Sequence, residues 1–354
     1  MSLPPNLPEH VLLEPVVPTL RHLLSAPYSR LAVLTDTNTA LHCYPLLREA
    51  LPADHLHICV PAGEEHKILE TCITIWQAMT QAGLDRKALM LNLGGGVITD
   101  MGGFCAATYK RGIRFINLPT TLLAQVDASI GGKLGIDFEG YKNHIGLFDD
   151  AEAVVIDPHF LKTLPERERR SGYAEVVKHA LIADREQWEA LQQQPWQELG
   201  WRSIIEHSIG IKAMIVARDP LERGLRKILN FGHTLGHALE SYRLEQTPEK
   251  RLLHGEAIAA GMICESWLSW KKAGLPEAER NTIARYLSSV WPEPMVLEEE
   301  IPAVLDRLPQ DKKNEGQQVL YSLLQQAGEA SYNCAASQDE ARQALEWYIK
   351  KGWQ

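Results

Sequence analysis

The pattern of apolar and polar positions changes character near the middle of the chain. In the first half, short apolar runs at 30–38 and 88–96 end in polar or glycine-rich turns, as buried strands do. Residues 68–84 lie between them and carry apolar side chains at helical spacing. The runs 115–121 and 153–158 have the composition of two more strands. This alternation predicts an α/β domain with a Rossmann-like parallel sheet covered by helices.

The second half has long amphipathic segments and few strand-like runs. Residues 163–182, 201–219 and 254–274 each show helical periodicity over several turns. We therefore predict an α/β nucleotide-binding domain over residues 1–165 and a mainly α-helical domain over residues 166–354. Ligand sites are common where two domains meet, so we expect the active site in the interdomain cleft.

The composition narrows the class of protein. The chain has 354 residues and a formal net charge of −9, which argues against non-specific binding to nucleic acid. It contains no run of about 20 apolar residues, and its start lacks the basic and apolar regions of a signal peptide. The six cysteines are scattered and suit reduced thiols. We expect a cytoplasmic enzyme with a small-molecule substrate and with no nucleic-acid or membrane partner.

A glycine-rich stretch, "NLGGGVITDMGGF" at residues 92–104, follows an apolar strand and enters a helix-like segment. Glycines allow the backbone to approach a phosphate, and the N–H groups at a helix start can bind it. The stretch does not match the G-x-G-x-x-G fingerprint of standard Rossmann sites. A tight strand-to-helix turn is the alternative, but three consecutive glycines followed by an acid favour a pyrophosphate loop.

Three cations stand beside turn-forming glycines in the stretch from residue 109 to residue 146. Arg111, Lys133 and Lys142 are accompanied there by Asp127 and Asn143. A single lysine is usually a solvated surface charge, but three cations beside glycine turns in an acidic protein favour an anion-binding pocket. The threonine pair at 120–121 either hydrogen-bonds a cofactor or ends a strand.

The second half carries residues suited to a metal site. Glu175 and Lys178 are three apart and share a helix face, where an intrahelical salt bridge is the common outcome. His233 and His237 are four apart and also share a face if they are helical, and His254 follows. The H-E-x-x-H signature of zinc peptidases is missing. A catalytic zinc commonly takes three His or Glu ligands, so Glu175 with two of the three histidines would suffice. Spacing alone leaves open which two.

Taken together, these motifs resemble the 3-dehydroquinate synthases of the sugar-phosphate cyclase group. The resemblance runs from "PAGEEHK" to "LLHGEAIAAGM", more than half of the chain, with a weaker similarity at "LPQDKKNEG". Its most specific parts, in order, are "GGGVITD", "PTTLLAQVDASIGGK", "YKN", "GYAEVVKH" and "NFGHTLGH".

The resemblance implies a lyase that depends on NAD and on zinc or cobalt, and that acts as a homodimer. Such an enzyme converts 3-deoxy-D-arabino-heptulosonate 7-phosphate into 3-dehydroquinate and phosphate, in the shikimate pathway to chorismate and the aromatic amino acids. A ring hydroxyl is oxidised transiently by NAD, phosphate leaves by β-elimination, the hydride returns, and an intramolecular aldol step closes the carbocycle.

The resemblance also implies roles for individual residues. The metal ligands would be Glu175, His233 and His254, and the catalytic groups His237, Glu222 and Lys178. The residues at substrate positions are Arg111, Asp127, Lys133, Asn143, Lys178 as well, Lys212, Arg226, Asn230 and Lys312 or Lys313. The residues at cofactor positions are Asp36, Asn38, Glu64, Lys67, Gly95, Gly96, Val97, Asp100, Thr120, Thr121, Lys133, Lys142, Phe160 and Thr163.

This chain departs from the family pattern in three places. Thr99 stands where glycine is usual, Leu134 stands where threonine is usual, and residues 240–253 form a longer segment that we interpret as an enlarged loop.

Other functions are compatible with parts of this pattern. A polyol dehydrogenase of the glycerol-dehydrogenase type would release NADH as a product, but a neutral polyol needs no basic stretch and no Lys178. Another sugar-phosphate cyclase would act on a substrate without a carboxylate, whereas Lys212, Arg226 and Asn230 favour one that has it. A non-catalytic protein that binds metal and nucleotide is the third alternative, although no site residue is obviously disabled.

Overall fold

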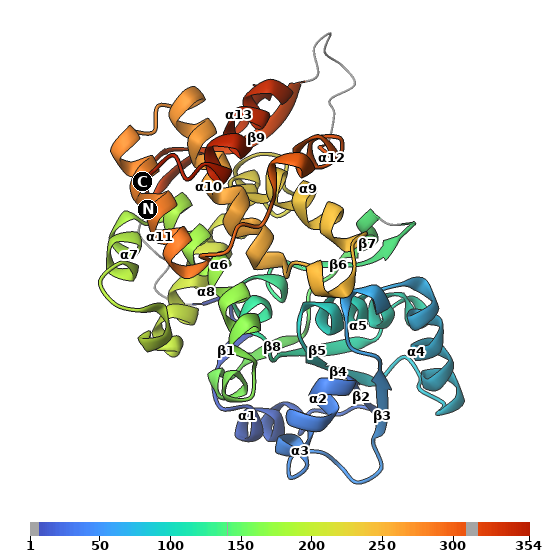
Figure 1. Ribbon diagram of the computed structural model, residues 1–354. Coiled ribbons are helices and arrows are strands. Elements are labelled where there is room, and N and C mark those ends of the chain that lie inside the picture. The colour runs from blue at the N-terminus through green and yellow to red at the C-terminus, as the bar shows by residue number, and fades with distance from the viewer. Residues whose placement is uncertain (1–6, 140, 309–317) are drawn as a thin grey trace. The chain divides into compact units, whose positions relative to one another are not determined.

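The computed structural model describes residues 7–139, 141–308 and 318–354 (Figure 1). The chain divides into two compact units between Arg169 and Arg170. Lys312 and Lys313, which we predicted to contact the substrate, lie outside the described residues.

The first unit is built on a parallel sheet of six strands in the order β1-β8-β5-β4-β2-β3. This confirms the predicted Rossmann-like sheet, and adds two strands, β1 and β3, that we did not predict. The strands are β1 Val11–Leu13, β2 Leu31–Asp36, β3 Leu56–Val60, β4 Leu89–Gly94, β5 Arg114–Pro119 and β8 Ala153–Ile156.

Helices cover both faces of this sheet, which explains why its central strands are apolar at nearly every position (Figure 1). On one face, Leu31 and Leu91 share a core cluster with Leu20 and Leu47. On the other face, α5 packs against β4 and β5. The helices of this unit are α1 Val16–Leu23, α2 Thr37–His42, α3 Tyr44–Leu47, α4 Leu69–Gln81 and α5 Gly96–Thr108.

The first unit also contains an antiparallel hairpin, β6 Lys133–Phe138 with β7 Tyr141–Phe148, where we expected only glycine-rich turns. Gly135 pairs with Gly146 in its register. A Cβ atom on Gly146 would lie 2.3 Å from the carbonyl oxygen of Leu134, so the strands approach too closely there for a side chain. The glycines that obscured the strand pattern are therefore what this pairing requires.

The second unit is mainly helical, as we predicted. Its helices are α6 Glu166–Ala183, whose first residues precede the division, α7 Arg185–Leu191, α8 Trp201–Arg218, α9 His233–Leu244, α10 His254–Lys272, α11 Glu277–Val290, α12 Ile301–Leu305 and α13 Gln338–Ile349. An antiparallel hairpin that we did not predict, β9 Gln318–Gln326 with β10 Glu329–Ser337, packs against α10. Helix α10 is buried on all sides through Ser269 and forms the centre of this unit.

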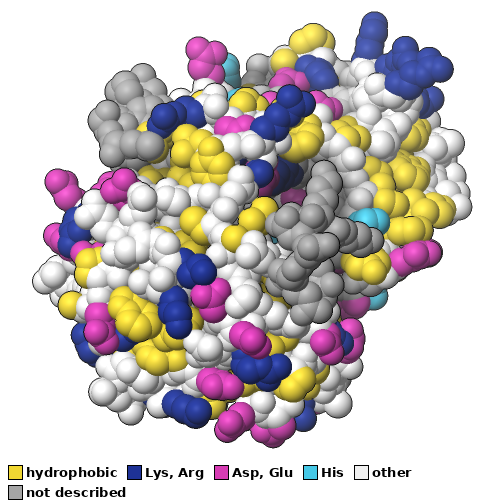
Figure 2. All heavy atoms as spheres, turned by 90° about the horizontal axis from the view of Figure 1, so that it is seen from above, with side chains coloured by type: hydrophobic (Ala, Val, Ile, Leu, Met, Phe, Trp, Pro, Cys, Tyr) yellow, Lys and Arg dark blue, Asp and Glu magenta, His cyan; other side chains and the backbone are white. Residues whose placement is uncertain are grey.

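One face of the molecule shows no single dominant charge (Figure 2). On the face drawn in Figure 2, basic and acidic side chains are interspersed with small hydrophobic patches. None of the helices in the described parts of the chain is both long and apolar enough for a membrane span.

Candidate functional site

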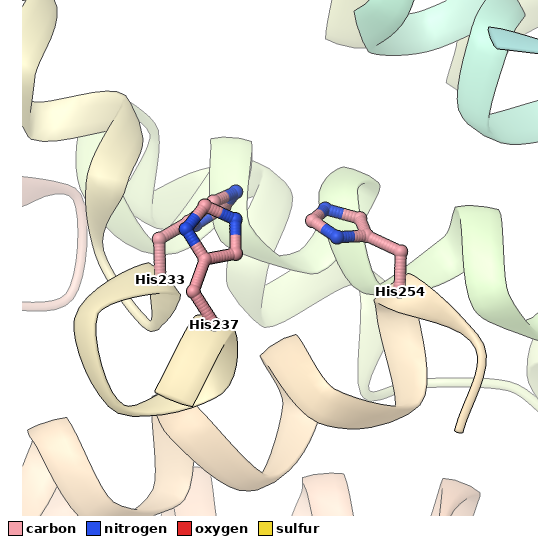
Figure 3. Close-up of side chains that lie close together, drawn as sticks. All are labelled: His233, His237 and His254. Carbon is pink, nitrogen blue, oxygen red and sulfur yellow. The ribbon is translucent and has the colours of Figure 1, made fainter. Parts of the chain in front are cut away.

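Three histidines from two helices face a common space (Figure 3). His233 is the first residue of α9, His237 lies one turn further along the same helix, and His254 is the first residue of α10. This confirms that His233 and His237 share a helix. Their ring centroids are 5.1 Å apart, and the His254 ring lies 5.4 Å from His233 and 5.8 Å from His237. One nitrogen from each ring falls within 4.8 Å of the others, close enough for a shared cation.

A carboxylate from α6 joins this cluster. Glu175 is fully buried, and its Oε1 lies 3.6 Å from Nε2 of His233 and 3.5 Å from Nε2 of His254. Its other oxygen is in contact with the Nζ of Lys178, which is 1% exposed. The salt bridge that their spacing allowed is therefore present, but it is buried beside the histidines rather than solvated.

The hydrogen bonds of two of these rings show which nitrogen is available. Nδ1 of His233 lies 3.2 Å from the carbonyl oxygen of Phe231, which can only accept, so Nδ1 carries the hydrogen. Nδ1 of His254 lies 3.4 Å from Oε2 of Glu240, a buried residue of α9 that we did not single out from the sequence. Both rings thus turn Nε2 toward Glu175, as metal-binding histidines with outer hydrogen-bond partners do.

The start of α10, where His254 lies, is held from two sides. The carboxylate of Glu256 accepts a hydrogen bond from the backbone N–H of Leu253 at 2.8 Å. The hydroxyl of Ser171, on α6, accepts one from the backbone N–H of Gly255 at 3.0 Å. A Cβ atom on Gly255 would lie 1.9 Å from the carbonyl oxygen of Ser171, so α6 and α10 are in close contact here. The position of His254 relative to α6 is therefore well determined.

The electrostatics of the two rings differ. Burial and the nearby Lys178 ammonium lower the pKa of His233 well below its ordinary value, so this ring is neutral and can donate its lone pair. Burial also lowers the pKa of His254, but the carboxylates of Glu240 and Glu175 outweigh burial and raise that pKa to about 10. In the metal-free protein a proton on His254 therefore provides a positive charge between two carboxylates.

This donor set fits a divalent transition metal. Imidazole nitrogens and one carboxylate are the donors of many catalytic zinc sites, which leave a further position open. In the predicted ligand set, Oε1 of Glu175 is in short contact with Nε2 of His233 and with Nε2 of His254. The three histidines alone are also close enough to hold an ion.

A loop between α8 and α9 brings together three of the predicted residues. Nδ2 of Asn230 donates to Oε1 of Glu222 at 2.8 Å. Arg226 is buried, and its Nη1 donates to the carbonyl oxygen of Pro220 at 2.6 Å. Lys212 is buried on α8, which packs against the turn Leu225–Asn230.

Asp219, which we did not predict, organises this loop. Its carboxylate accepts backbone N–H groups from Arg223 at 3.0 Å, Gly224 at 2.7 Å and Arg226 at 3.0 Å. The loop also holds Glu222 in the left-handed region, at φ 56°. Asp219 could have been suggested by its position directly after a helix and before proline and glycine, where such side chains bind backbone groups.

The predicted pyrophosphate loop lies at the carboxyl edge of the parallel sheet, where ligands of such sheets bind. Gly95 connects β4 to α5, and Gly96 and Val97 are the first two residues of α5. The backbone N–H of Thr120 donates to the carbonyl of Gly94 at 2.9 Å. A Cβ atom on Gly95 would lie 2.9 Å from Cγ2 of Thr121, so the threonine pair lies directly against the loop.

A buried lysine connects three further predicted residues in this unit. Nζ of Lys67, which is 3% exposed, lies 2.7 Å from the Asp100 carboxylate and 2.6 Å from Oδ1 of Asn143. Burial lowers the pKa of Lys67, but Asp100 and Glu64 outweigh burial and raise it, so the ammonium stays charged. Glu64 also pairs with Lys142 at 3.8 Å.

Other predicted cofactor residues lie at the ends of strands. Asp36 ends β2 and caps α2, because its carboxylate accepts the backbone N–H of Thr39 at 2.8 Å, and Asn38 lies in the first turn of that helix. Phe160 is buried after β8, and the hydroxyl of Thr163 donates to its carbonyl at 3.3 Å.

The remaining predicted substrate residues of this unit come from three different elements. Lys133 begins β6 and Asp127 lies in a π-helical turn, Ala124–Ala128. Arg111 follows the last turn of α5, at the opposite end of this helix from the glycine loop, roughly 20 Å along its axis. It lies among other basic side chains, Arg86, Lys87 and Lys110. Within its own unit, therefore, Arg111 is not beside the glycine loop.

The departures from the family pattern are accommodated. Thr99 is buried in α5, and its hydroxyl donates to the carbonyls of Gly95 and Gly96 at 3.3 and 3.2 Å. Leu134 packs against Gly103, where a Cβ atom would lie only 2.5 Å away. The interpretation of 240–253 as a loop was wrong in part, because α9 continues through Leu244.

Comparisons with known proteins identify the family to which this chain belongs. The family model described as 3-dehydroquinate synthase N-terminal matches residues 57–171, and the one described as 3-dehydroquinate synthase C-terminal matches residues 172–314. A 3-dehydroquinate synthase from Parabacteroides distasonis is 39% identical over 330 residues, covering 92% of this chain and 93% of that protein. This chain belongs to the 3-dehydroquinate synthase family. The predicted resemblance is confirmed, and with it the class of enzyme, a carbon–oxygen lyase acting on phosphates.

Solved structures place this 3-dehydroquinate synthase fold among related enzymes. ValA, a 2-epi-5-epi-valiolone synthase from Streptomyces hygroscopicus subsp. jinggangensis with NAD+ and Zn2+ bound, is 27% identical, with a TM-score of 0.81 and 99% of each chain covered. A glycerol dehydrogenase from Schizosaccharomyces pombe is 15% identical, with a TM-score of 0.62 and 100% and 92% covered. The fold is therefore shared with polyol dehydrogenases, and the sequence is what separates the families.

Proposed function

We propose that this chain converts 3-deoxy-D-arabino-heptulosonate 7-phosphate into 3-dehydroquinate and phosphate. The observation that carries the proposal is that Nε2 of His233 and Nε2 of His254 both lie within 3.6 Å of Oε1 of Glu175, in a chain that belongs to the 3-dehydroquinate synthase family over most of its length. Glycerol-dehydrogenase-type chemistry is disfavoured because its representatives share only the fold.

The proposal includes two cofactors, NAD and a zinc or cobalt ion. Glu175, His233 and His254 would hold the ion, and the glycine loop with the Lys67–Asp100 pair would hold the dinucleotide. When bound, the ion polarises a substrate hydroxyl as a Lewis acid, and NAD takes up a hydride and returns it. The neutral Nε2 of His233 and the buried Glu175 carboxylate suit the first role.

Within the histidine cluster, His237 has a separate part. It is the exposed member, and its ring stands 5.1 Å from His233 on the same helix. An exposed imidazole beside the reacting centre can exchange protons with solvent, so His237 would move protons to and from the substrate. Glu222, held by Asn230 at 2.8 Å, would be a second acid–base group.

The buried cations of the helical unit would bind the negatively charged groups of the substrate. Lys178, Lys212 and Arg226 are buried in the helical unit, where ammonium and guanidinium groups bind anions more strongly than at an exposed surface. Arginine can bind a carboxylate through two parallel hydrogen bonds. We assign these cations to the carboxylate and phosphate of the heptulosonate. The sequence-based assignments of Arg111, Asp127, Lys133, Asn143, Lys312 and Lys313 to the substrate remain predictions.

By analogy with the family, we expect a cytoplasmic protein that forms a homodimer. Sedimentation equilibrium of the purified protein checks the dimer, with a mass of twice 39.7 kDa as the expected result.

The test of the proposed activity is release of inorganic phosphate from the heptulosonate phosphate. Omitting NAD from nucleotide-free protein, or adding a chelator, should each abolish release, and absorbance at 340 nm should show no net NADH. Steady NADH formation from glycerol or another polyol, without any phosphate release from the heptulosonate, would instead identify a dehydrogenase.

A further inference from the structure

The two helices that carry the histidines are packed without intervening side chains. Gly232, directly before α9, has φ 81°, a conformation that glycine adopts without strain. A Cβ atom on Gly261 of α10 would lie 2.0 Å from the carbonyl oxygen of Gly232, and one on Gly236 would lie 3.1 Å from the carbonyl oxygen of Ala257. The backbones of α9 and α10 therefore touch through glycines. A side chain of α10 can reach the start of α9 directly.

Glu265 of α10 makes this connection. It is fully buried, its Oε2 accepts the backbone N–H of Gly232 at 2.7 Å, and its Oε1 accepts that of Leu235 at 3.0 Å. Gly232 is the N-cap residue of α9 and Leu235 lies in its first turn, where backbone donors have no partner within the helix. The residue at the N-cap is Gly232, which offers no side chain to cap the turn. The carboxyl of Glu265 replaces that cap from a neighbouring helix, on both sides of His233.

The neighbouring buried polar group of α10 has a different partner. The hydroxyl of Ser269, one turn after Glu265, accepts the backbone N–H of Leu324 in β9 at 2.9 Å and donates to the carbonyl of Glu265 at 2.6 Å. Ser269 therefore holds the hairpin, whereas Glu265 holds the helix that carries His233 and His237. This difference makes Ser269 a matched control.

We propose that Glu265 is a positioning residue for the metal site. By binding the first turn of α9 it sets where Nε2 of His233 lies relative to Glu175 and His254, and it thereby determines the affinity and the coordination geometry for a divalent cation. The inference rests on the metal site of the proposed function and adds to that site a residue that touches neither metal nor substrate.

The experiment uses Co2+ as the probe and compares the parent with Glu265→Met, Glu265→Gln and Ser269→Ala. Methionine keeps the volume of the side chain and removes both acceptors, whereas glutamine keeps one acceptor. We expect Glu265→Met to weaken Co2+ binding by about 10–100-fold, the range for outer hydrogen-bond partners of metal ligands, and to shift the visible absorption of the bound ion. Glu265→Gln should show a smaller loss, and Ser269→Ala should match the parent.

All titrations are made at a temperature where circular dichroism shows the variant folded. Parent-like affinity and absorption in Glu265→Met would overturn the inference, and so would an equal loss in Ser269→Ala, because Glu265 would then act only through stability. If Glu265→Met does not fold, the test uses Glu265→Gln instead. Parent-like Co2+ affinity and absorption in Glu265→Gln would then overturn the inference. A parent protein that binds no Co2+ would instead contradict the metal site of the proposed function.

Discussion

The glycine loop and the histidine cluster are two sites of different construction. The glycine loop is one continuous stretch between β4 and α5, and its position follows from the carboxyl edge of a parallel sheet. The histidine cluster takes side chains from α6, α9 and α10, and each side chain depends on how three helices pack. At the loop the backbone itself is available to a ligand because the glycines leave room for it, whereas in the cluster each side chain must be held in place by its neighbours.

The groups that hold the two sites in place differ in kind. Around the histidines they are carboxyl side chains, because Glu240 binds His254 and Glu265 binds the start of α9. Beside the glycine loop they are threonines: the hydroxyl of Thr99 donates to the carbonyl of Gly95, and the methyl group of Thr121 lies against Gly95. Substitutions should therefore affect the two sites through different measurements: metal content for the histidines, and affinity for the dinucleotide at the loop.

The largest effect is expected when one of the proposed metal ligands is removed. His254→Ala leaves Glu175 and His233 as the remaining members of the proposed ligand set, and it should abolish metal retention and phosphate release together. Metal content after dialysis and turnover are the measurements. Full metal content in this variant would contradict the ligand set and would favour another group of donors.

The next largest effect distinguishes the proposed acid–base histidine, His237, from the proposed metal ligands of the same cluster. His237→Ala should keep a full complement of metal while turnover falls by about 10²–10⁴-fold, the usual contribution of a positioned acid–base group. The measurements are again metal content and phosphate release. If the metal is lost here as well, His237 is a ligand, and the three-histidine set that the ring distances also allow is correct.

A smaller effect is expected at the glycine loop. In Gly95→Ala the new Cβ atom would lie 2.9 Å from Cγ2 of Thr121, an overpacked contact worth about 1–3 kcal/mol. We expect the KM for NAD to rise by roughly 10-fold with metal content unchanged. Combining it with Thr121→Ser removes that methyl group and should restore part of the affinity. A double variant no better than Gly95→Ala would show that the contact is not the cause.

The last expected effect is a pH dependence of stability, which builds up gradually over several pH units. Burial raises the pKa of Glu265 from 4.5 to about 8, against the lowering effect of the α9 N–H groups. Between these values the folded protein holds a proton that the unfolded chain has released. The resulting stabilisation is fully present below the unfolded pKa and is lost as pH rises through about 8, at up to about 1.4 kcal/mol per pH unit.

Glu265→Gln cannot ionise, so its thermal midpoint should fall less than that of the parent between about pH 5 and pH 8. Thermal unfolding in the presence of a chelator measures this difference without a contribution from bound metal. Parallel curves for the two proteins would show that Glu265 keeps the same protonation state on folding.

The elements that sequence reasoning identified correctly are those with a strong local pattern. The apolar runs of β2, β4 and β5 are buried on both faces, and α8 and α10 carry long helical segments. The hairpins were missed for two reasons. Glycines interrupt the strand pattern of β6 and β7. The strands β9 and β10 lie in a unit that is otherwise mainly helical.

Residues that act through others were also missed. Asp219, Glu240 and Glu265 are acidic side chains in or beside helices, where a solvated carboxylate is the ordinary expectation. Glu240 and Glu265 are distinguished by their burial and by partners distant in the sequence, and Asp219 is distinguished by the backbone groups that it binds in the closed loop.

By itself, the sequence determined the family, the parallel sheet, the glycine loop and the kinds of donor available for a metal, because these depend on residue types in a fixed local order. The tertiary structure decided which nitrogen of His233 and His254 faces Glu175, that Arg111 ends far along α5 from the glycine loop, and that Glu265 caps a helix other than its own. Side chains meet through packing between helices, and packing distances are not written in the spacing of residues along the chain.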